Sequence, residues 1–383
     1  MLFRVKNELN IASVSDIHLG HRRNPTRRII GNLFTALPDD EVTAALDLLL
    51  IPGDVFDNLK SLPDTDVVDI DYWIYQTLRL AKKHNIVVVV LEGTPGHDWK
   101  QSRRFVEINE NAGIGADLRY IETLSIEYIE QYGISVLCVP DEWDTPENTL
   151  SQVHDLLRAK GLSQVDFAIM HGQFPHQLPE HIKAPKHDPE AYMALVKYVI
   201  FIGHVHTFSV YRSLVNPGGS FIVAQGSFDR LTHGEEGPKG HVRAKVRAVG
   251  DIDLQFIENE NAMKFVTVTC NSMSLEETLA TITAQVKDLP DGSFVRVKAD
   301  WDNPILTNME ELIRRFPLAN WTKLSTEAVV EEEQKVMEED TPFVPIVLTR
   351  DNLPGLLMER IARSGASGSV IDAATDILME IIK

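Results

Sequence analysis

The amino-acid sequence predicts an α/β sandwich over residues 1–262. Two continuous apolar runs, 48–51 and 86–91, show no polar alternation, which is typical of strands buried on both faces of a covered sheet. Between them, apolar residues recur at helical spacing from Val67 to Ala81, which predicts a strand–helix–strand unit. Four more short apolar runs predict strands, and this alternation favours an α/β sandwich over a barrel or a helical bundle. These runs are 11–14, 135–139, 167–170 and 199–202.

A second region, residues 263–325, predicts a small α+β domain. Strands are expected at 265–269 and 293–299 around a helix at 275–286, followed by another helix and a strand within 301–324. We expect Trp301, like Trp73 in the first region, to lie in a hydrophobic core.

The last part of the chain changes character twice. Residues 326–345 form an acidic linker in this interpretation, because seven carboxylates and one lysine lie between Glu327 and Asp340. Residues 346–383 recover a helical pattern, with one apolar stripe that predicts amphipathic C-terminal helices. The stripe consists of Val370, Ala374, Ile377, Leu378 and Ile381.

The composition excludes several classes of protein. With 37 basic and 56 acidic side chains the formal net charge is −19, which argues against a nucleic-acid coat protein or a basic membrane-binding protein. It leaves open an enzyme that binds a phosphodiester through metal ions. Two cysteines are too few for a thiolate zinc cluster or a disulfide-stapled scaffold. No apolar run approaches the ~20 residues of a membrane span, so we expect a cytoplasmic protein without a membrane partner.

Short polar motifs directly follow five of the predicted strands. Each motif is common by chance, but parallel strands bring their carboxyl ends to one edge of a sheet, where α/β proteins bind ligands. The joint order of the motifs therefore indicates a functional site rather than scattered surface residues. The motifs are Asp16-Ile17-His18, Gly53-Asp54, Gly93-Thr94-Pro95-Gly96-His97-Asp98, His171-Gly172 and Gly203-His204-Val205-His206.

Carboxylates and imidazoles in this pattern suit a pair of divalent cations. Two adjacent cations need a bridging carboxylate, with imidazoles completing each shell, and Asp54 in its glycine turn suits the bridge. Residues at i and i+2 of a strand end point the same way, so Asp16 and His18 could share one ion. His204 and His206 could repeat that geometry, or loop curvature could split them between the two ions.

The motif set resembles the calcineurin-like metallophosphoesterase superfamily over residues 10 to about 210. A later run resembles the segment that closes the nuclease domain of SbcD-type double-strand-break repair nucleases, a group that includes meiotic-recombination-eleven-like and phage recombination nucleases. The α+β region matches their capping domain in position and size. The C-terminal helices match the segment that docks on the SbcC-type (Rad-fifty-type) ATPase. The run consists of Gly226 to Arg230, Glu235-Glu236 and Lys239-Gly240.

The resemblance implies a four-layer sandwich with a capping domain and a manganese-dependent DNA exonuclease and endonuclease activity. The protein would be the nuclease subunit of an SbcCD-like complex for DNA repair and recombination, working as a homodimer with its ATPase partner. Water activated by two Mn²⁺ ions, with Mg²⁺ as the alternative, would hydrolyse the phosphodiester. His97 would be the catalytic histidine, oriented by Asp98. One ion would bind Asp16, His18, Asp54 and His206, and the other Asp54, His171 and His204.

One position departs from the family pattern. The asparagine ligand expected immediately before the catalytic histidine is replaced by Gly96. Thr94 falls where the asparagine would lie if the turn is counted from Gly93, so we name it as a candidate metal ligand. Loss of a neutral ligand should weaken the second ion without removing it.

Other charged residues are open to two interpretations. Arg22 and Arg23 follow the first motif and would either contact DNA phosphates or form an ordinary solvated loop. Asp57 is left out of the site as a surface carboxylate, and Glu235 is expected to support a ligand rather than to be one. Two other functions remain: a phosphatase or cyclic-nucleotide phosphodiesterase of the same fold, and a non-catalytic scaffold with a decayed metal site.

Overall fold

The computed structural model describes residues 6–60, 64–142, 144–179, 181–213, 215–216 and 218–326. The predicted acidic linker beyond Thr326 and the predicted C-terminal helices lie outside the described residues.

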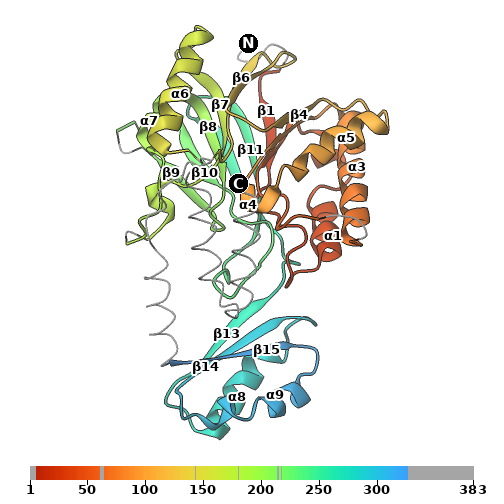
Figure 1. The fold of residues 1–383 in the computed structure, drawn as a ribbon, viewed down its shortest axis with the longest axis vertical. Helices are drawn as coiled ribbons and strands as arrows, with labels where there is room; N and C mark the ends of the chain where they lie inside the picture. The colour runs from red at the N-terminus through yellow and green to blue at the C-terminus, as the bar shows by residue number, and fades with distance from the viewer. Residues whose placement is uncertain are drawn as a thin grey trace, which may run out of the picture. The chain divides into compact units, whose positions relative to one another are not determined.

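Two six-stranded sheets, each mostly parallel, form the first region (Figure 1). The first sheet has the order β12-β11-β1-β2-β3-β4, with β1 to β4 parallel and β11 and β12 antiparallel. Its strands are β1 (Leu9–Ser13), β2 (Leu48–Pro52), β3 (Val87–Leu91), β4 (Leu118–Ile121), β11 (Gly240–Ala248) and β12 (Asp251–Glu258).

The second sheet has the order β5-β6-β7-β8-β10-β9, and its four central strands are parallel. Its strands are β5 (Ser125–Ile129), β6 (Ile134–Val139), β7 (Val165–His171), β8 (Val196–Gly203), β9 (Ser209–Arg212) and β10 (Phe221–Ala224). All six strands predicted from apolar runs are therefore present, and the predicted α/β class is confirmed.

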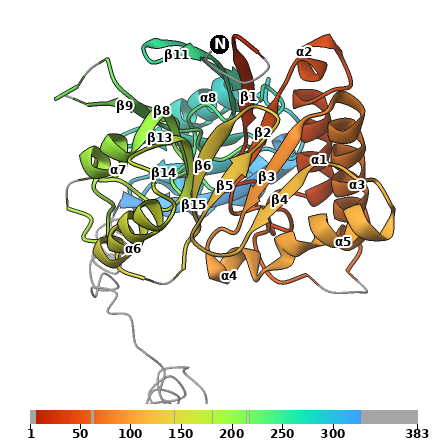
Figure 2. The same cartoon turned by 90° about the horizontal axis from the view of Figure 1, so that it is seen from above.

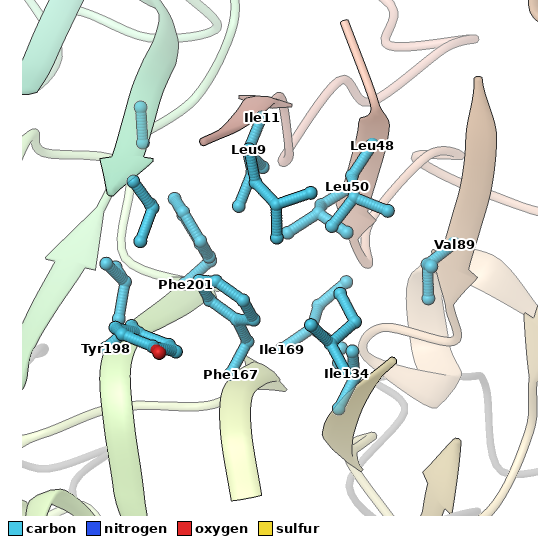
Figure 3. Close-up of a cluster of buried hydrophobic side chains, with 14 of the residues drawn as sticks. Leu9, Ile11, Leu48, Leu50, Val89, Ile134, Phe167, Ile169, Tyr198 and Phe201 are labelled. Atoms are coloured by element: carbon cyan, nitrogen blue, oxygen red, sulfur yellow. The ribbon is translucent and has the colours of Figure 1, made fainter. Parts of the chain in front are cut away.

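The two sheets pack face to face across a shared hydrophobic core (Figure 3). Alternate residues of each strand point into this core, such as Leu48 and Leu50 of β2 opposite Phe167 and Ile169 of β7. The intervening residues of the same strands, including Leu49 and Ile51, face outward into separate cores under the helices. Both faces of each sheet are thus buried, which is why the strands read as continuous apolar runs.

Helices cover the outer face of each sheet (Figure 2). Apolar faces of α1 (Thr26–Ala36), α3 (Asp66–His84) and α5 (Arg104–Asn111) pack on the first sheet. Those of α6 (Pro146–Ala159) and α7 (Pro189–Leu195) pack on the second. The short elements are α2 (Glu41–Ala44), α4 (Pro95–Asp98), η1 (Gln101–Arg103) and η2 (Pro175–Gln177).

Residues 265–325 form a three-stranded parallel sheet with its own core. The elements are β13 (Phe265–Cys270), α8 (Leu275–Val286), β14 (Phe294–Ala299), η3 (Pro304–Leu306), α9 (Met309–Arg315) and β15 (Asn320–Ser325). A capping box between Ser274 and Glu277 starts α8, whose buried residues pack on the sheet. The prediction for Trp301 was wrong: this side chain is 64% exposed, because it lies in the turn after β14 rather than in an element.

Among the described residues, no helix is both long and apolar enough to cross a membrane.

Candidate metal centre

The candidate ligands lie at the carboxyl ends of β1, β2, β3, β7 and β8; His171 is the last residue of β7, and the others follow their strands. Backbone hydrogen bonds join the segments that follow β1 and β2. The amide of Ile17 donates to the carbonyl oxygen of Asp54 (2.8 Å), and the amide of Leu19 donates to the carbonyl oxygen of Val55 (2.9 Å). The carboxyl ends of neighbouring parallel strands therefore bring Asp16, His18 and Asp54 together, as the motif order predicted.

Four of the six predicted aspartate and histidine ligands have a left-handed backbone. The φ angles are +50° at Asp16, +51° at His18, +50° at Asp54 and +101° at His204. Such conformations cost non-glycine residues of order 1–3 kcal/mol each and cluster at functional sites. Asp16 and His18 thus reach one ligand group from a left-handed backbone, and not from the extended i, i+2 alternation that the sequence suggested.

The six predicted aspartate and histidine ligands gather in two groups of potential metal ligands; a third such group consists of His18, Asp57 and His97. In each group the ligand atoms lie within 4.8 Å of one another; four of the six predicted ligands are buried, and His204 and His206 are half-buried. The first ligand group consists of Asp16, His18 and His206; the second ligand group consists of Asp54, His171 and His204. His204 and His206 belong to different groups, so loop curvature splits this pair.

Asp54 faces both groups. Its Oδ1 lies 3.3 Å from Nε2 of His171, and its Oδ2 lies 3.7 Å from Nε2 of His18. Burial opposes ionisation of Asp54, but the imidazoles of His171 and His18 outweigh it and lower the pKa of the carboxyl group. The carboxylate is therefore charged and has one oxygen directed at each group.

Hydrogen bonds to Nδ1 fix the orientation of two imidazoles. His171 donates to the carbonyl oxygen of Pro52 (2.8 Å), and His206 donates to the carboxylate of Glu235 (3.0 Å). Nε2 of each ring is then the atom directed at the carboxylates, which is how protein imidazoles present a lone pair to a metal ion. In the first ligand group, Nε2 of His18 and Nε2 of His206 lie only 3.0 Å apart.

The charges around the histidines favour a cation at both places. Burial alone would lower the pKa of His171, but the charge of Asp54 outweighs it and raises that pKa to about 10. Burial and the charge of His171 lower the pKa of His204. Burial would lower the pKa of His206 too, but the hydrogen bond to Glu235 raises it. A proton or a metal ion can supply the positive charge, and the donor set of carboxylates and imidazoles suits a divalent metal ion.

Glycines allow the close packing of the second ligand group. A Cβ at Gly93 would lie 2.4 Å from Oδ1 of Asp54, and one at Gly53 would lie 2.4 Å from Nδ1 of His171. Neither contact is sterically permitted, so the motif glycines leave space for the ligands themselves.

Thr94 lies against the second ligand group. Its hydroxyl oxygen is 3.1 Å from Nε2 of His171, 3.3 Å from Oδ2 of Asp54 and 3.4 Å from Nδ1 of His204. Its backbone N–H donates to Oδ1 of Asp54 at 2.6 Å. Gly96, in contrast, has no atom within 4 Å of where its Cβ would be. The hydroxyl of Thr94 thus contacts all three residues of the second ligand group.

His97 lies next to the first ligand group. Its ring centroid is 5.0 Å from that of His18, and its Nδ1 donates to the backbone carbonyl of Asp57 at 2.9 Å. The carboxylate of Asp57 also lies 3.4 Å from Nδ1 of His18. Asp57 therefore belongs to the site, although its position three residues after Asp54 gave no signal beyond that of a surface carboxylate.

Asp98 has a different role from the one expected. Its fully buried carboxylate accepts hydrogen bonds from the backbone N–H groups of Gly93 (2.8 Å), Asp54 (3.1 Å) and Phe56 (2.9 Å). It therefore holds the loops after β2 and β3 together, while the carbonyl of Asp57 orients His97. Burial and the charges of Asp54 and Glu92 raise the pKa of Asp98.

Glu235 supports His206 together with a buried lysine. Burial opposes ionisation of Glu235, but its hydrogen bond with His206 lowers its pKa to about 2. The ammonium group of Lys239 lies 3.1 Å from the same carboxylate and donates to the carbonyl oxygen of His206 (2.6 Å) and the hydroxyl of Ser227 (2.8 Å). Both come from the run that follows β10, as expected of supporting residues.

The arginines after the first motif differ in their surroundings. Arg27 pairs with Asp69 at 3.2 Å, and Arg28 donates to the carbonyl oxygen of Asn261 at 3.0 Å. Arg22 is exposed and Arg23 is half-buried on the same loop. Contact of Arg22 and Arg23 with DNA stays a prediction.

Comparison with known proteins assigns no family to this chain. No family model matches the chain, and no curated protein matches it. One solved structure that matches is 15% identical and covers 65% of this chain and the whole of its own, with a TM-score of 0.36. That likeness is too weak to support an argument about fold or function.

Proposed function

We propose that this chain is a two-metal phosphodiesterase that cuts DNA, with the calcineurin-like fold and the SbcD-type family that its motifs resemble. The observation that carries the proposal is the position of Asp54. One carboxylate oxygen faces the first ligand group and the other faces the second. A carboxylate shared between two imidazole-rich groups is the arrangement expected of a pair of adjacent divalent cations.

Bound at these groups, divalent ions would polarise the phosphoryl oxygens and make water a better nucleophile. The chain's own residues would hold the ions and protonate the leaving group. The imidazoles of His171 and His206, fixed through Nδ1, would present their Nε2 atoms to the ions. His97 holds its Nδ1 on the carbonyl of Asp57, which leaves Nε2 to donate a proton to the departing oxygen when the ring is protonated.

DNA is the substrate that the sequence favours. The run from Gly226 to Gly240 resembles SbcD-type nucleases, and Glu235 and Lys239 of that run support His206. In the proposed complex the homodimer and the ATPase partner would provide most of the DNA contacts, which agrees with a net charge of −19. The same chemistry would also serve a phosphatase or a cyclic-nucleotide phosphodiesterase, because fold does not fix substrate.

Digestion of end-labelled duplex DNA with Mn²⁺, Mg²⁺ or EDTA tests the proposal. We expect Mn²⁺-dependent cutting by the native chain and its loss in His97→Ala, with His154→Ala on the exposed face of α6 as the matched control. Hydrolysis of bis-(p-nitrophenyl) phosphate in preference to p-nitrophenyl phosphate would favour the diesterase over the phosphatase.

Metal content separates the remaining outcomes. If the chain alone cuts nothing but binds close to two Mn²⁺ ions, the activity would require the ATPase partner. If it binds no Mn²⁺, the proposal is wrong and the scaffold interpretation gains support.

A further inference from the structure

Trp99 is an exposed aromatic residue beside the candidate catalytic histidine. Its side chain is 56% exposed, although large aromatic side chains are usually mostly buried, as Trp73 is in the core of the first region. It follows His97 by two residues, so its Cα lies within about 7.6 Å of the Cα of His97. Trp99 therefore ends the short helix α4 that carries His97.

The backbone at this position is unusual. Trp99 has φ +49° and Lys100 has φ +59°, so two consecutive residues other than glycine are left-handed. Left-handed conformations in bulky residues are uncommon and persist where the surroundings fix them. Here the amide of Lys100 donates to the buried carboxylate of Glu92, which also accepts from the hydroxyl of Tyr120 at 2.8 Å.

The indole itself is also held in place. Its N–H donates to the carbonyl oxygen of Gly96 at 2.8 Å, which ties the ring to the loop that precedes His97. The space around the Cα of Gly96 is open, with no atom within 4 Å of where a Cβ would be. The ring is thus pre-oriented and solvent-exposed, so little conformational entropy remains to be lost when something stacks on it.

The basic residues near Trp99 do not explain why its side chain is exposed. Lys100 and Arg103, on the same segment, both pair with the carboxylate of Glu122, at 3.3 and 3.5 Å. What the segment offers beside the metal centre is a flat, fixed π-surface. Every nucleobase has a π-face, and aromatic side chains bind unpaired bases without sequence preference.

We propose that Trp99 stacks on an unpaired nucleobase next to the phosphodiester that is cut. This inference rests on the proposed function and specifies its substrate as single-stranded DNA or a frayed duplex end. A base within a duplex has both faces covered by its neighbours, so an intact interior would not reach this ring.

Three variants separate stacking from a structural role. Trp99→Ala removes the ring, Trp99→Phe keeps a smaller one, and Trp301→Ala removes another exposed tryptophan, from the small domain. Each is assayed with Mn²⁺ on bis-(p-nitrophenyl) phosphate, which has no base, and on a single-stranded oligonucleotide with either a normal or an abasic terminal nucleotide.

We expect Trp99→Ala to bind the normal oligonucleotide at least about five-fold more weakly than the native chain. This loss of oligonucleotide binding should exceed any loss of activity on the small diester. It should disappear with the abasic oligonucleotide, and Trp99→Phe should restore part of the binding. The oligonucleotide should also quench tryptophan fluorescence in the native chain and in Trp301→Ala, and less in Trp99→Phe.

Two results would overturn the inference. Equal binding of the normal oligonucleotide by the native chain and Trp99→Ala would exclude stacking, and would leave the ring free to contact a protein partner. Equal losses on the small diester and on both oligonucleotides would show that Trp99 only supports the His97 loop. Failure of the native chain to cut either substrate would count against the proposed function, whereas the fluorescence titration would still decide the stacking.

Discussion

The two ligand groups differ in what holds their histidines. His206 of the first group is oriented by the side chain of Glu235, which Lys239 in turn supports. His171 of the second group is oriented by the backbone carbonyl of Pro52, the last residue of β2. The His206 side chain is 26% exposed, whereas that of His171 is fully buried.

This difference shows two ways of fixing an imidazole. A backbone carbonyl at the end of a central strand cannot be changed by substitution, so the second ligand group is set by the fold. The first ligand group depends on side chains that a substitution can alter one at a time. The two groups should therefore respond separately to changes at these supporting contacts, and together to a change at Asp54.

Replacing Asp54 should give the largest effect, because this carboxylate faces both groups. We expect Asp54→Asn, which keeps one acceptor for the N–H of Thr94, to lower Mn²⁺-dependent phosphodiester hydrolysis at least about a thousand-fold, through loss of several kcal/mol of charge stabilisation. Metal analysis should show fewer bound ions. Asp155→Asn, on an exposed part of α6, is the control. Retention of two tightly bound ions would contradict the shared role of Asp54.

Replacing Glu235 should separate the two groups. Glu235→Gln removes the charge that orients His206, and losses of such supporting contacts typically weaken metal affinity about 10- to 100-fold. A calorimetric titration with Mn²⁺ should show one binding step of lower affinity, at the first ligand group, and one of unchanged affinity. The neighbouring exposed Glu236→Gln provides the control. Equal weakening of both steps would show that the groups are not independent.

Protons should compete with metal at the second ligand group. His171 has a pKa of about 10 without metal, so at neutral pH an ion must displace its proton. Each unit of pH increase below about 10 should therefore raise the affinity of that step roughly ten-fold. Titrations at pH 6.5, 7.3 and 8 would measure the slope, and an affinity independent of pH would contradict the expectation.

Replacing Thr94 should give the smallest effect, limited to the second ligand group. Thr94→Val removes the hydroxyl near His171 but keeps the shape and the N–H that donates to Asp54. Loss of one neutral contact, about 1 kcal/mol, should weaken Mn²⁺ binding to the second ligand group about five-fold. Thr94→Asn supplies an amide and should tighten it. Thr35→Val, on an exposed part of α1, is the control. A change in Mn²⁺ affinity confined to the first ligand group would exclude Thr94 from the second.

Much of the candidate site followed from the order of motifs along the chain. Asp16, Asp54 and His171 each follow an apolar run, and parallel strands necessarily bring such positions to one sheet edge. Asp57 did not stand out, because it meets His18 and His97 only through the loop after β2. Asp98 was placed correctly but assigned the wrong partners, because its three backbone donors come from two separate loops.

The sequence by itself determined the α/β class, the strands and six of the side chains that gather at the site, because apolar periodicity and strand-end position are local properties of the chain. The tertiary structure decided how those side chains divide. It assigned His204 and His206 to different groups, gave Asp54 to both, and set Thr94 against the second. These outcomes depend on left-handed turns and on contacts between loops far apart in sequence, and no local pattern encodes such contacts.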